Sequence, residues 1–289
     1  MSNEKKAKKP IRTKRNYKDS VFKRLFGDRE KLAELYNAIN GTNYKADDII
    51  LTTLDNTIFI GRENDISFKI GDKLIVFVEH QSSINPNMPL RFLFYTARSY
   101  LELVENESIY STQLIKILPP EFIVLYNGED EYPAESDLKL SDAFINPEID
   151  NLELKVKVYN VNKGQNQEIM GKSATLSGYS IFIARVRENI ENGLETEQAI
   201  EKSVKDCIQD DILKEFLLKY GSDVINMLSL EFKLEDALRV RENDGKEKAK
   251  EEIAINLIKN GMSKEFVIEN TKISIKRIEE IYKKIKVKE

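Results

Sequence analysis

The chain ends one of its most apolar segments with polar side chains that could take part in catalysis. Residues 74–78 (Leu-Ile-Val-Phe-Val) predict a buried strand, and Glu79, His80 and Gln81 follow directly. A carboxylate at the end of a buried strand has to be solvated, paired or bound to a metal, because burying a bare charge is costly. Glu79 and Gln81 are two residues apart and therefore point to the same face of the strand. His80, the only histidine in the chain, points to the other face, where packing or a hydrogen bond is expected.

A second carboxylate, Asp65, comes within reach of Glu79 in one register of the β-hairpin that the sequence predicts. A two-residue turn would place the two acids on opposite faces of the hairpin. A three-residue turn, residues 71–73, sets Asp65 across from Glu79 and stacks the apolar side chains of both strands on one face. Because a one-residue slip moves every side chain to the other face, the hydrophobic pattern selects this second register. Its apolar pairs are Ile70 with Leu74, Phe68 with Val76 and Ile66 with Val78.

The facing carboxylates of Asp65 and Glu79 would repel each other unless positive charge lies between them. Mg²⁺ is the usual cation at such a site, since it takes oxygen ligands and keeps several waters. A bound Mg²⁺ can polarise a phosphoryl oxygen and generate hydroxide near neutral pH. The alternative is a structural ion pair, in which a lysine or arginine binds the same acids. The acid pair by itself leaves both explanations open.

The elements that must position these residues form a mixed α/β pattern. Apolar residues recur at helix spacing in some segments and alternate, or run without interruption, in others. The order helix, strands, helix, strands, helix predicts a mixed sheet flanked by helices. The expected elements are two helices within 16–40, strands at 49–60, 64–70 and 74–79, a helix from Pro89 to about residue 106, strands at 121–126 and 152–161 separated by a turn-rich stretch over 127–150, and a helix over 167–191.

These residues and their spacing resemble the PD-(D/E)XK nuclease superfamily. More narrowly, they resemble the Rpn-type recombination-promoting nucleases, also called PD-(D/E)XK family putative transposases. The central pattern is Asp65 followed by Glu79-x-Gln81 on a β-hairpin that comes after an N-terminal helix. The resemblance extends over residues 16–190 and implies the restriction-endonuclease-like fold of that superfamily. Three segments carry it further: DSVFKRLFG at 19–27, EHQSS at 79–83 with MPLR at 88–91 and Tyr95, and PEFIVLYNG at 120–128.

The resemblance implies metal-dependent hydrolysis of phosphodiester bonds in DNA, with Mg²⁺, or another divalent cation such as Mn²⁺ or Ca²⁺, as the cofactor. Asp65 would be the central metal ligand, Glu79 the second and the backbone carbonyl of His80 the third, while Asp19 would add an acid through water. Gln81 stands at the catalytic position where the superfamily motif has lysine. A lysine places positive charge beside the transition-state phosphate, whereas glutamine can only orient a water by hydrogen bonds. The Rpn-type family is known for glutamine here, so the match holds and the electrostatic role is left vacant.

Arg91, Tyr95 and Arg98 are candidates for contacting a DNA phosphate and for filling that vacancy. They are spaced i, i+4 and i+7 on the helix after the strand, and therefore lie on one face. Arg91 near a scissile phosphate could supply a bidentate contact. The alternative is that Arg91 pairs with one of the two acids and that Tyr95 packs in the core.

The C-terminal part of the chain contains a second pattern with a link to DNA. Ser263 and Ser274 can each cap a short helix. With the helix before them, these helices make a trihelical unit over 252–287 that resembles a helix-turn-helix. Its second helix would present Lys276 and Arg277 to DNA.

Composition limits the classes of protein to which the chain can belong. With 289 residues and one cysteine, it has ample core for one large or two modest domains and no disulfide framework or cysteine-rich zinc site. No apolar stretch approaches the length of a membrane span, and nothing resembles a signal peptide. We therefore expect a cytoplasmic protein that does not bind membranes. Its expected parts are a disordered basic arm over 1–15, a nuclease-like domain over 16–190 and an all-α region over 191–289.

Charge is distributed unevenly along the chain. The net charge is −4, yet residues 1–15 hold seven basic side chains against one acid, and residues 272–289 hold seven against three. Basic ends of this kind can bind polyphosphate, or they can simply keep a protein soluble.

We therefore expect a Mg²⁺-dependent DNA endonuclease associated with recombination or transposition, with DNA as its partner. The alternative is a catalytically weak or inactive DNA-binding or interaction module derived from such a nuclease, which the glutamine at position 81 and the acidic body of the chain favour. The oligomeric state is open. A homo-oligomer is one alternative, because cutting two strands usually needs two active sites.

Overall fold

The computed structural model describes residues 21–52, 66–71, 74–104, 108–146 and 151–286. The chain divides into two compact units, Met1–Ser229 and Leu230–Glu289. The predicted arm over residues 1–15 lies outside the described residues. The predicted boundary at residue 190 falls inside the first unit, so the extent of the nuclease-like domain stays a prediction.

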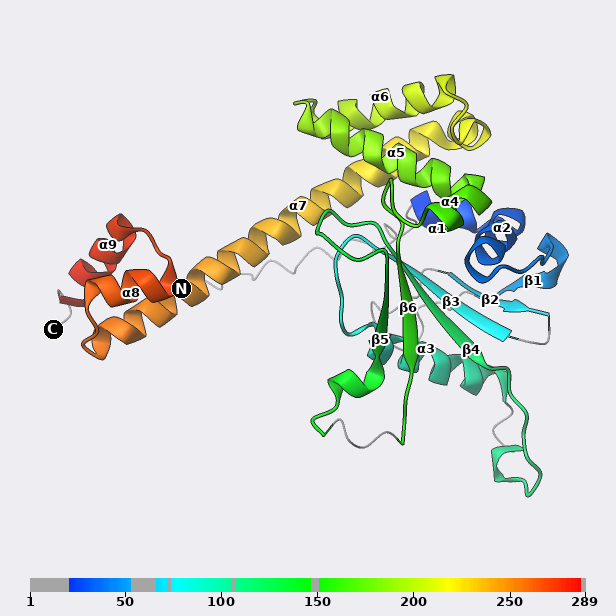
Figure 1. Cartoon of the computed structure of the whole chain (residues 1–289), viewed down its shortest axis with the longest axis horizontal. Helices are drawn as coiled ribbons and strands as arrows, with labels where there is room; N and C mark the ends of the chain where they lie inside the picture. Colours follow the sequence, from blue (N-terminus) through cyan, green and yellow to red (C-terminus); the bar gives the residue numbers. More distant parts are fainter. Residues whose placement is uncertain (1–20, 53–65, 72–73, 105–107, 147–150, 287–289) are drawn as a thin grey trace, which may run out of the picture. The chain divides into compact units, whose positions relative to one another are not determined.

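A mixed β-sheet of six described strands forms the centre of the first unit (Figure 1). The strand order is β1-β2-β3-β4-β6-β5, with β3, β4 and β6 parallel to one another and the remaining neighbours antiparallel. Because β3, β4 and β6 run in one direction, their carboxyl ends meet at one edge of the sheet. The mixed α/β architecture predicted from the sequence is confirmed. The strands are β1 (Ile49–Leu51), β2 (Ile66–Ile70), β3 (Leu74–Gln81), β4 (Pro120–Tyr126), β5 (Glu135–Lys139) and β6 (Lys155–Asn160).

Helices cover both faces of this sheet (Figure 1). On one face, Phe92 of α3 packs on Phe77 of β3 with ring centroids 6.3 Å apart. On the other face, Phe22 of α1 stacks on His80 of the same strand at 4.7 Å. The central strands can therefore be apolar on both sides.

The described helices of both units are α1 (Val21–Phe26), α2 (Arg29–Asn40), α3 (Met88–Leu103), α4 (Gln167–Lys172), α5 (Ala174–Glu191), α6 (Thr196–Gln209), α7 (Lys214–Lys259), α8 (Lys264–Thr271) and α9 (Ile275–Lys286), with short 3₁₀ turns at Ala46–Asp48, Ser108–Tyr110 and Leu140–Ala143.

The hairpin of β2 and β3 adopts the register that the hydrophobic pattern predicted. The apolar side chains of β2 lie on the same face as Val76 and Val78 of β3, and there Tyr36 of α2 meets Phe68 edge to face. In the opposite register, the apolar side chains of β2 would point to the other face of the sheet, and its polar side chains would point into the core. The observed pairs are Ile70 with Leu74, Phe68 with Val76 and Ile66 with Val78.

The prediction of turns over residues 127–150 was wrong at β5. This strand pairs antiparallel with β6 at the edge of the sheet. Its sequence, ESDLK, has side chains that are at most half-buried. An edge strand of this composition is stabilised mainly by backbone pairing with its neighbour, and hydrophobic periodicity does not reveal that pairing.

The prediction of one helix over residues 167–191 was also wrong, because the chain forms two helices that meet at Ser173. The Ser173 hydroxyl caps α5 by accepting from the Leu176 amide at 3.1 Å. Glu34 of α2 adds a second cap, since its carboxylate accepts from the Ser173 hydroxyl at 2.8 Å and from the Thr175 amide at 2.9 Å. A negative charge at a helix N-terminus is stabilising. The contact with α2 therefore sets the start of α5.

The second unit contains the three-helix pattern predicted near the C-terminus. Ser263 caps α8 by accepting from the Phe266 amide at 3.2 Å, and Ser274 accepts from the Arg277 amide at 3.4 Å in the first turn of α9. The helix expected before them is the last part of α7, which is 46 residues long and contains the boundary between the units. None of the described helices is both long enough and apolar enough to cross a membrane. The small core consists of Ala254, Ile258, Val267, Ile273, Ile278 and Ile281.

Candidate functional site

The candidate site lies at the sheet edge where the parallel strands β3, β4 and β6 end. In the parallel register, Glu79 and Gln81 stand beside Val124 and Tyr126 of β4. The Asn127 amide donates to the Gln81 carbonyl at 2.8 Å and extends the pairing past the end of β4. Open α/β sheets commonly bind their ligands outside the carboxyl ends of the strands. The predicted catalytic residues of β3, Glu79 and Gln81, therefore lie at the edge of the sheet where folds of this class commonly bind their ligands.

Glu79 is a buried carboxylate that binds an arginine of α3. Its side chain is 4% exposed, and Arg91 Nη2 donates to its Oε2 at 2.9 Å. The Arg91 side chain is 32% exposed and reaches solvent. A buried carboxylate needs a cation or hydrogen-bond donors to offset its desolvation. The ion pair that the sequence left open as an alternative is therefore present, while contact of Arg91 with DNA stays a prediction.

Tyr95 orients the guanidinium of Arg91. Its hydroxyl accepts from Arg91 Nη2 at 2.9 Å and from Nε at 3.3 Å. The Tyr95 ring is buried, with Phe92 packed edge to face against it. Arg91 Nη1 donates to Met88 Sδ at 3.3 Å. Carboxylate, phenol and thioether thus hold one guanidinium at the carboxyl end of β3.

The alternation predicted along β3 is confirmed. Gln81 faces α3, where its Nε2 donates to Met88 Sδ. His80 faces the opposite layer, where its Nε2 and the Tyr179 hydroxyl form a hydrogen bond of 3.2 Å and its ring stacks on Phe22. The His80 side chain therefore has structural partners away from the site, and a ligand role would fall to its backbone carbonyl alone.

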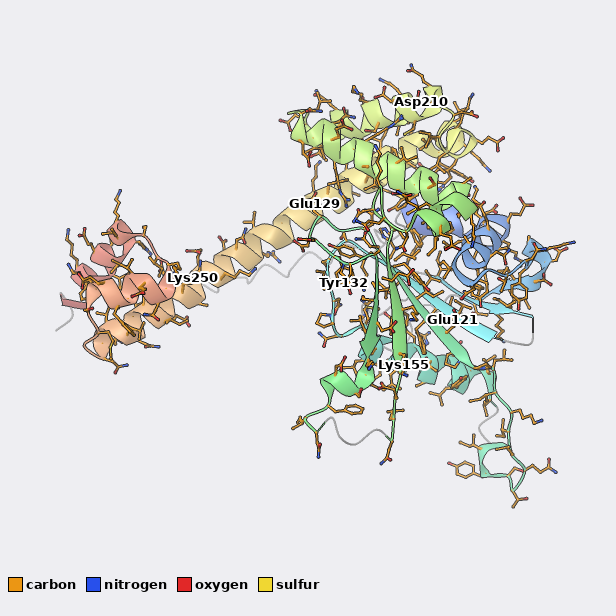
Figure 2. All side chains as sticks on the ribbon, in the orientation of Figure 1. Glu121, Glu129, Tyr132, Lys155, Asp210 and Lys250 are labelled. Atoms are coloured by element: carbon orange, nitrogen blue, oxygen red, sulfur yellow. The ribbon has the colours of Figure 1, made fainter. Side chains whose placement is uncertain are left out.

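An arginine that the sequence analysis did not single out, Arg187 of α5, holds the loop after β4. Its guanidinium donates to the Asn127 carbonyl through Nη2 and to Asn162 Oδ1 through Nη1 at 3.0 Å. Its Nε lies 3.8 Å from Glu129 Oε1, and its side chain is 18% exposed. Figure 2 labels Glu129 and Tyr132 of this loop. Arg187 therefore fixes the backbone that continues the pairing of Gln81.

A signal for Arg187 was present in the sequence. Tyr179 and Ile183 precede it by eight and four residues on α5, and both are buried. An arginine that continues an apolar helical stripe has to find polar partners in the interior. A lone arginine in such a stripe is therefore a candidate for holding a loop or a ligand.

Gly128, the residue after Asn127, allows the loop to pass close to β3. A Cβ at this position would lie 2.3 Å from the Ser82 carbonyl oxygen and 2.4 Å from the Tyr126 hydroxyl.

We expect Gly128→Ala to lower the free energy of unfolding by about 2 kcal/mol, as overpacking does in a filled interior. The matched control is Gly171→Ala in α4, where nothing lies within 4 Å of the added Cβ. Alanine there should raise stability by up to about 1 kcal/mol through its helix propensity. Urea denaturation of both variants measures the difference, and equal stability of Gly128→Ala and the unaltered protein would contradict the expectation.

Two of the predicted metal ligands, Asp19 and Asp65, lie outside the described residues, so their positions stay predictions. The third member of the predicted phosphate-binding face, Arg98, forms an ion pair with Glu102 at 3.3 Å and is mostly buried.

The predicted DNA contacts of the second unit differ in their surroundings. Lys276 is exposed on α9. Arg277 is bound on two sides, by Glu251 at 2.6 and 3.0 Å and by Glu280 at 2.8 Å. A phosphate would have to compete with both carboxylates for Arg277. DNA binding by this unit stays a prediction.

The donors at the candidate site are oxygen atoms. They are the Glu79 carboxylate, the Gln81 side-chain amide and the backbone carbonyl of His80, and oxygen donors are what Mg²⁺ prefers. Among the described residues, no three acidic, histidine or cysteine side chains gather in a group that could hold a metal. A buried carboxylate that already binds a cationic group marks a position that favours positive charge. The oxygen donors present are of the kind that Mg²⁺ takes, and the second acid predicted from the sequence, Asp65, lies outside the described residues.

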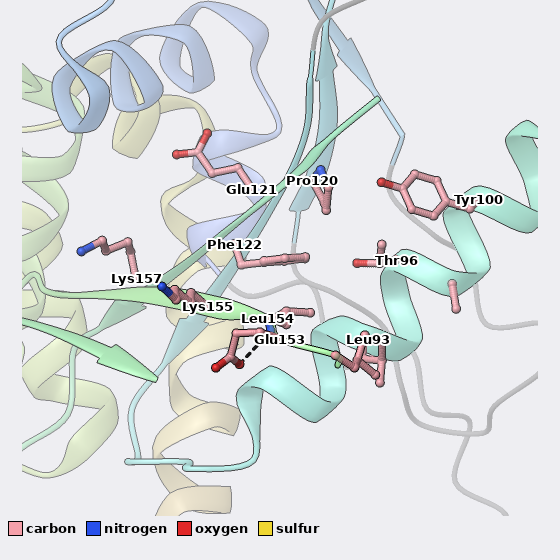
Figure 3. A pocket seen from close by; sticks show the side chains of 12 residues that line it. Leu93, Thr96, Tyr100, Pro120, Glu121, Phe122, Glu153, Leu154, Lys155 and Lys157 are labelled. Atoms are coloured by element: carbon pink, nitrogen blue, oxygen red, sulfur yellow. Dashed lines mark hydrogen bonds between the residues drawn. The ribbon is translucent and has the colours of Figure 1, made fainter. Parts of the chain in front are cut away.

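A cavity of about 680 Å³ lies toward the other end of α3 (Figure 3). Its lining includes none of Glu79, Gln81 and Arg91, so it is separate from the candidate site. Its wall is mostly apolar, and Glu121 on its rim accepts a hydrogen bond of 2.8 Å from Tyr36. Burial, together with this contact, raises the pKa of Tyr36 well above its ordinary value. The lining residues are Leu93, Thr96, Ala97 and Tyr100 of α3, Pro120, Glu121 and Phe122 of β4, and Leu152, Glu153, Leu154, Lys155 and Lys157.

Residues 65–214 match the family described as "Putative transposase, YhgA-like". The match covers more than half of the chain, begins at Asp65 and includes β3, α3, β4 and the whole of α5. Comparison with the curated proteins and with the solved structures gives no match. A transposase family implies a nuclease-like role in transposition, with DNA as the partner. The chain therefore belongs to the YhgA-like putative transposase family, which is of the PD-(D/E)XK type.

Proposed function

We propose that the chain is a DNA endonuclease that hydrolyses phosphodiester bonds with Mg²⁺, or a related cation such as Mn²⁺ or Ca²⁺, in recombination or transposition. The observation that carries the proposal is Glu79, a carboxylate buried at the carboxyl end of β3 in a hairpin of defined register. If the pairing that ends with Ile66 and Val78 continued by one pair, position 65 would stand opposite Glu79. The family match includes both Asp65 and Glu79.

Asp65 and Glu79 would hold the divalent cation, with the backbone carbonyl of His80 as a further oxygen ligand and Asp19 acting through water. The bound cation would polarise the phosphoryl oxygen and lower the pKa of a water. The role of Glu79 is then electrostatic, since its buried carboxylate attracts a cation more strongly than an exposed one would. Asp65 would add the second negative charge that distinguishes a divalent site from a simple ion pair.

Gln81 would orient the attacking water. Its side-chain amide has a donor and an acceptor end, and its Nε2 is directed to Met88 Sδ. The amide oxygen can accept a hydrogen bond from the water as the water oxygen bonds to phosphorus and the bond from phosphorus to the leaving oxygen breaks. The water would lose its proton to bulk solvent, and the leaving oxygen would take a proton from bulk solvent, because the amide of Gln81 can do neither. Gln81 carries no charge and cannot stabilise the transition state as lysine does.

Arg91 is the cation that could supply this missing charge. It lies beside Glu79, is oriented by Tyr95 and is partly exposed. A guanidinium can bind two phosphate oxygens at once. The charge that the superfamily motif places on the strand would thus come from the neighbouring helix.

The cytoplasm is the proposed location. The single cysteine, Cys207, is buried beside Arg185. Burial raises the pKa of its thiol, which disfavours the reactive thiolate and argues against a role as nucleophile. A reducing compartment such as the cytoplasm keeps thiols reduced.

A second candidate function is a DNA-binding module with weak or no catalysis. Two observations favour it: glutamine at position 81, and the ion pair that Glu79 makes with Arg91. In this case the ion pair would be the permanent state of the site, and the protein would bind DNA without hydrolysing it.

Incubation of supercoiled plasmid with the purified full-length chain separates the two functions. We expect Mg²⁺ to convert the plasmid to nicked or linear DNA and EDTA to stop the conversion, because the acids act only through the cation. Binding of the same plasmid in a gel-shift experiment provides the control for a folded protein. If folded protein binds the plasmid but leaves it intact at high concentration with Mg²⁺ or Mn²⁺, the non-catalytic module is the better description.

A further inference from the structure

We propose that Arg91 is an exchangeable counterion of Glu79, which leaves the carboxylate for a DNA phosphate when a divalent cation takes its place. The proposal rests on the proposed metal site and adds a coupling to it. Binding of the metal and binding of DNA would each favour the other, and Arg91 would connect them.

The first argument is that Arg91 and a divalent cation compete for one carboxylate. The Arg91 guanidinium lies 2.9 Å from Glu79 Oε2. A divalent cation on the same carboxylate would place two positive centres within a few ångströms of each other in a poorly solvated position, where their repulsion is strong. The two carboxylates of the proposed site, Asp65 and Glu79, balance the charge of Mg²⁺ alone, so Arg91 is held there as well only if additional negative charge arrives. A DNA phosphate supplies that charge.

The second argument is that the two partners of the ion pair differ in their freedom to move. Glu79 belongs to a central strand, and its side chain is 4% exposed, whereas the Arg91 side chain is 32% exposed. A partly exposed arginine on a helix can turn toward solvent by changing its side-chain torsions, but a carboxylate inside the sheet cannot follow it. The exchange of cations at Glu79 would therefore occur by movement of the Arg91 side chain.

The third argument is that Arg91 has a second anchor besides the carboxylate. Nη2 is shared between Glu79 and the Tyr95 hydroxyl, each at 2.9 Å, and Nε contacts the same hydroxyl at 3.3 Å. Tyr95 is buried and belongs to the same helix. When the contact with Glu79 is lost, Tyr95 can keep the guanidinium near the strand end, where a phosphate held by the metal would lie. The entropy lost on binding the phosphate is then smaller than for an unrestrained arginine.

The exchange predicts reciprocal coupling between cation and DNA. Thermodynamic linkage requires that DNA raise the affinity for Mg²⁺ by the same factor by which Mg²⁺ raises the affinity for DNA. We expect a factor of about ten, within the usual range for coupled sites. Without DNA, removal of the competing guanidinium should strengthen Mg²⁺ binding by a similar factor.

The test is isothermal titration of the full-length chain with Mg²⁺, alone and with a phosphorothioate duplex that resists hydrolysis. Arg91→Gln should bind Mg²⁺ about tenfold more tightly than the unaltered protein without DNA. The duplex should raise the Mg²⁺ affinity of this variant by a clearly smaller factor than that of the unaltered protein, because only the direct attraction between cation and phosphate remains. Arg91→Lys keeps the positive charge and should keep Mg²⁺ affinity near that of the unaltered protein. The matched control is Arg185→Gln, which removes an arginine of similar exposure from an ion pair with Asp210 and should leave both quantities unchanged.

The outcomes separate this proposal from the proposed function. If the unaltered protein binds Mg²⁺ and nicks plasmid, but Arg91→Gln binds Mg²⁺ no more tightly and keeps the response to DNA, the exchange is wrong and the nuclease stands. If the unaltered protein neither binds Mg²⁺ nor nicks plasmid, both proposals fall. Circular dichroism melts of each variant establish that the compared proteins are folded.

Discussion

Replacement of Glu79 by glutamine is expected to lower the rate of Mg²⁺-dependent plasmid cleavage by about a hundredfold or more. The substitution keeps the shape of the side chain but removes the negative charge that would hold the cation. Loss of a few kcal/mol of charge stabilisation at the metal corresponds to such a factor, since each 1.4 kcal/mol changes the rate about tenfold. Initial rates of nicking at saturating Mg²⁺ measure the effect. Asp65→Asn should behave in the same way.

The control for this substitution is Glu168→Gln. Glu168 is an exposed acid that pairs with Lys172 one turn along α4, so the same chemical change there should leave cleavage unaltered. Cleavage by Glu79→Gln at the rate of the unaltered protein would remove Glu79 from the reaction and with it the proposed metal site.

The stability of a Glu79→Ala variant gives a second measurement on the same residue. From the sequence, a site of two facing carboxylates predicts that deletion of one acid leaves stability level or raises it, whereas an ion pair predicts a loss. The observed contact with Arg91 leads us to expect a loss of about 1–3 kcal/mol without a divalent cation. Mg²⁺ should raise the melting temperature of the unaltered protein but not that of the variant.

Replacement of Arg187 by methionine is expected to lower the free energy of unfolding by about 3 kcal/mol. The guanidinium makes two hydrogen bonds from a largely buried position, to the Asn127 carbonyl and to Asn162 Oδ1. Methionine can occupy the space of the stem but leaves both acceptors without this donor, and buried groups that lose a charged partner are costly. Because the Asn127 amide also pairs with the Gln81 carbonyl, cleavage should fall as well. Urea denaturation followed by circular dichroism measures the stability.

The matched control is Arg185→Met, two residues earlier on the same helix. The Arg185 side chain is 24% exposed, close to the 18% of Arg187, but its carboxylate partner, Asp210, is 56% exposed. An ion pair with an exposed partner contributes little, so we expect a loss below about 1 kcal/mol. Equal losses for the two variants would show that Arg187 does not hold the loop more firmly than an ordinary surface contact.

The sequence by itself determined the features that depend on periodicity along one strand or helix. Side chains alternate strictly along a strand, so the faces of Glu79, His80 and Gln81 could be predicted, and the stacking of apolar residues selected the hairpin register that the structure confirms. The caps at Ser263 and Ser274 were predictable for a related reason, because a cap depends on residues within one turn of each other. The family resemblance followed from the same local spacing.

Only the tertiary structure decided which partners these side chains meet. The approach of Arg91 to Glu79 was one of two open alternatives, because it depends on how α3 lies on the sheet. Strand β5 is stabilised by pairing with β6, and the start of α5 by Glu34 of α2; both contacts join segments distant in the chain. Arg187 meets the Asn127 carbonyl across 60 residues. No local pattern encodes such contacts, because their free energy appears only when packing brings the two segments together.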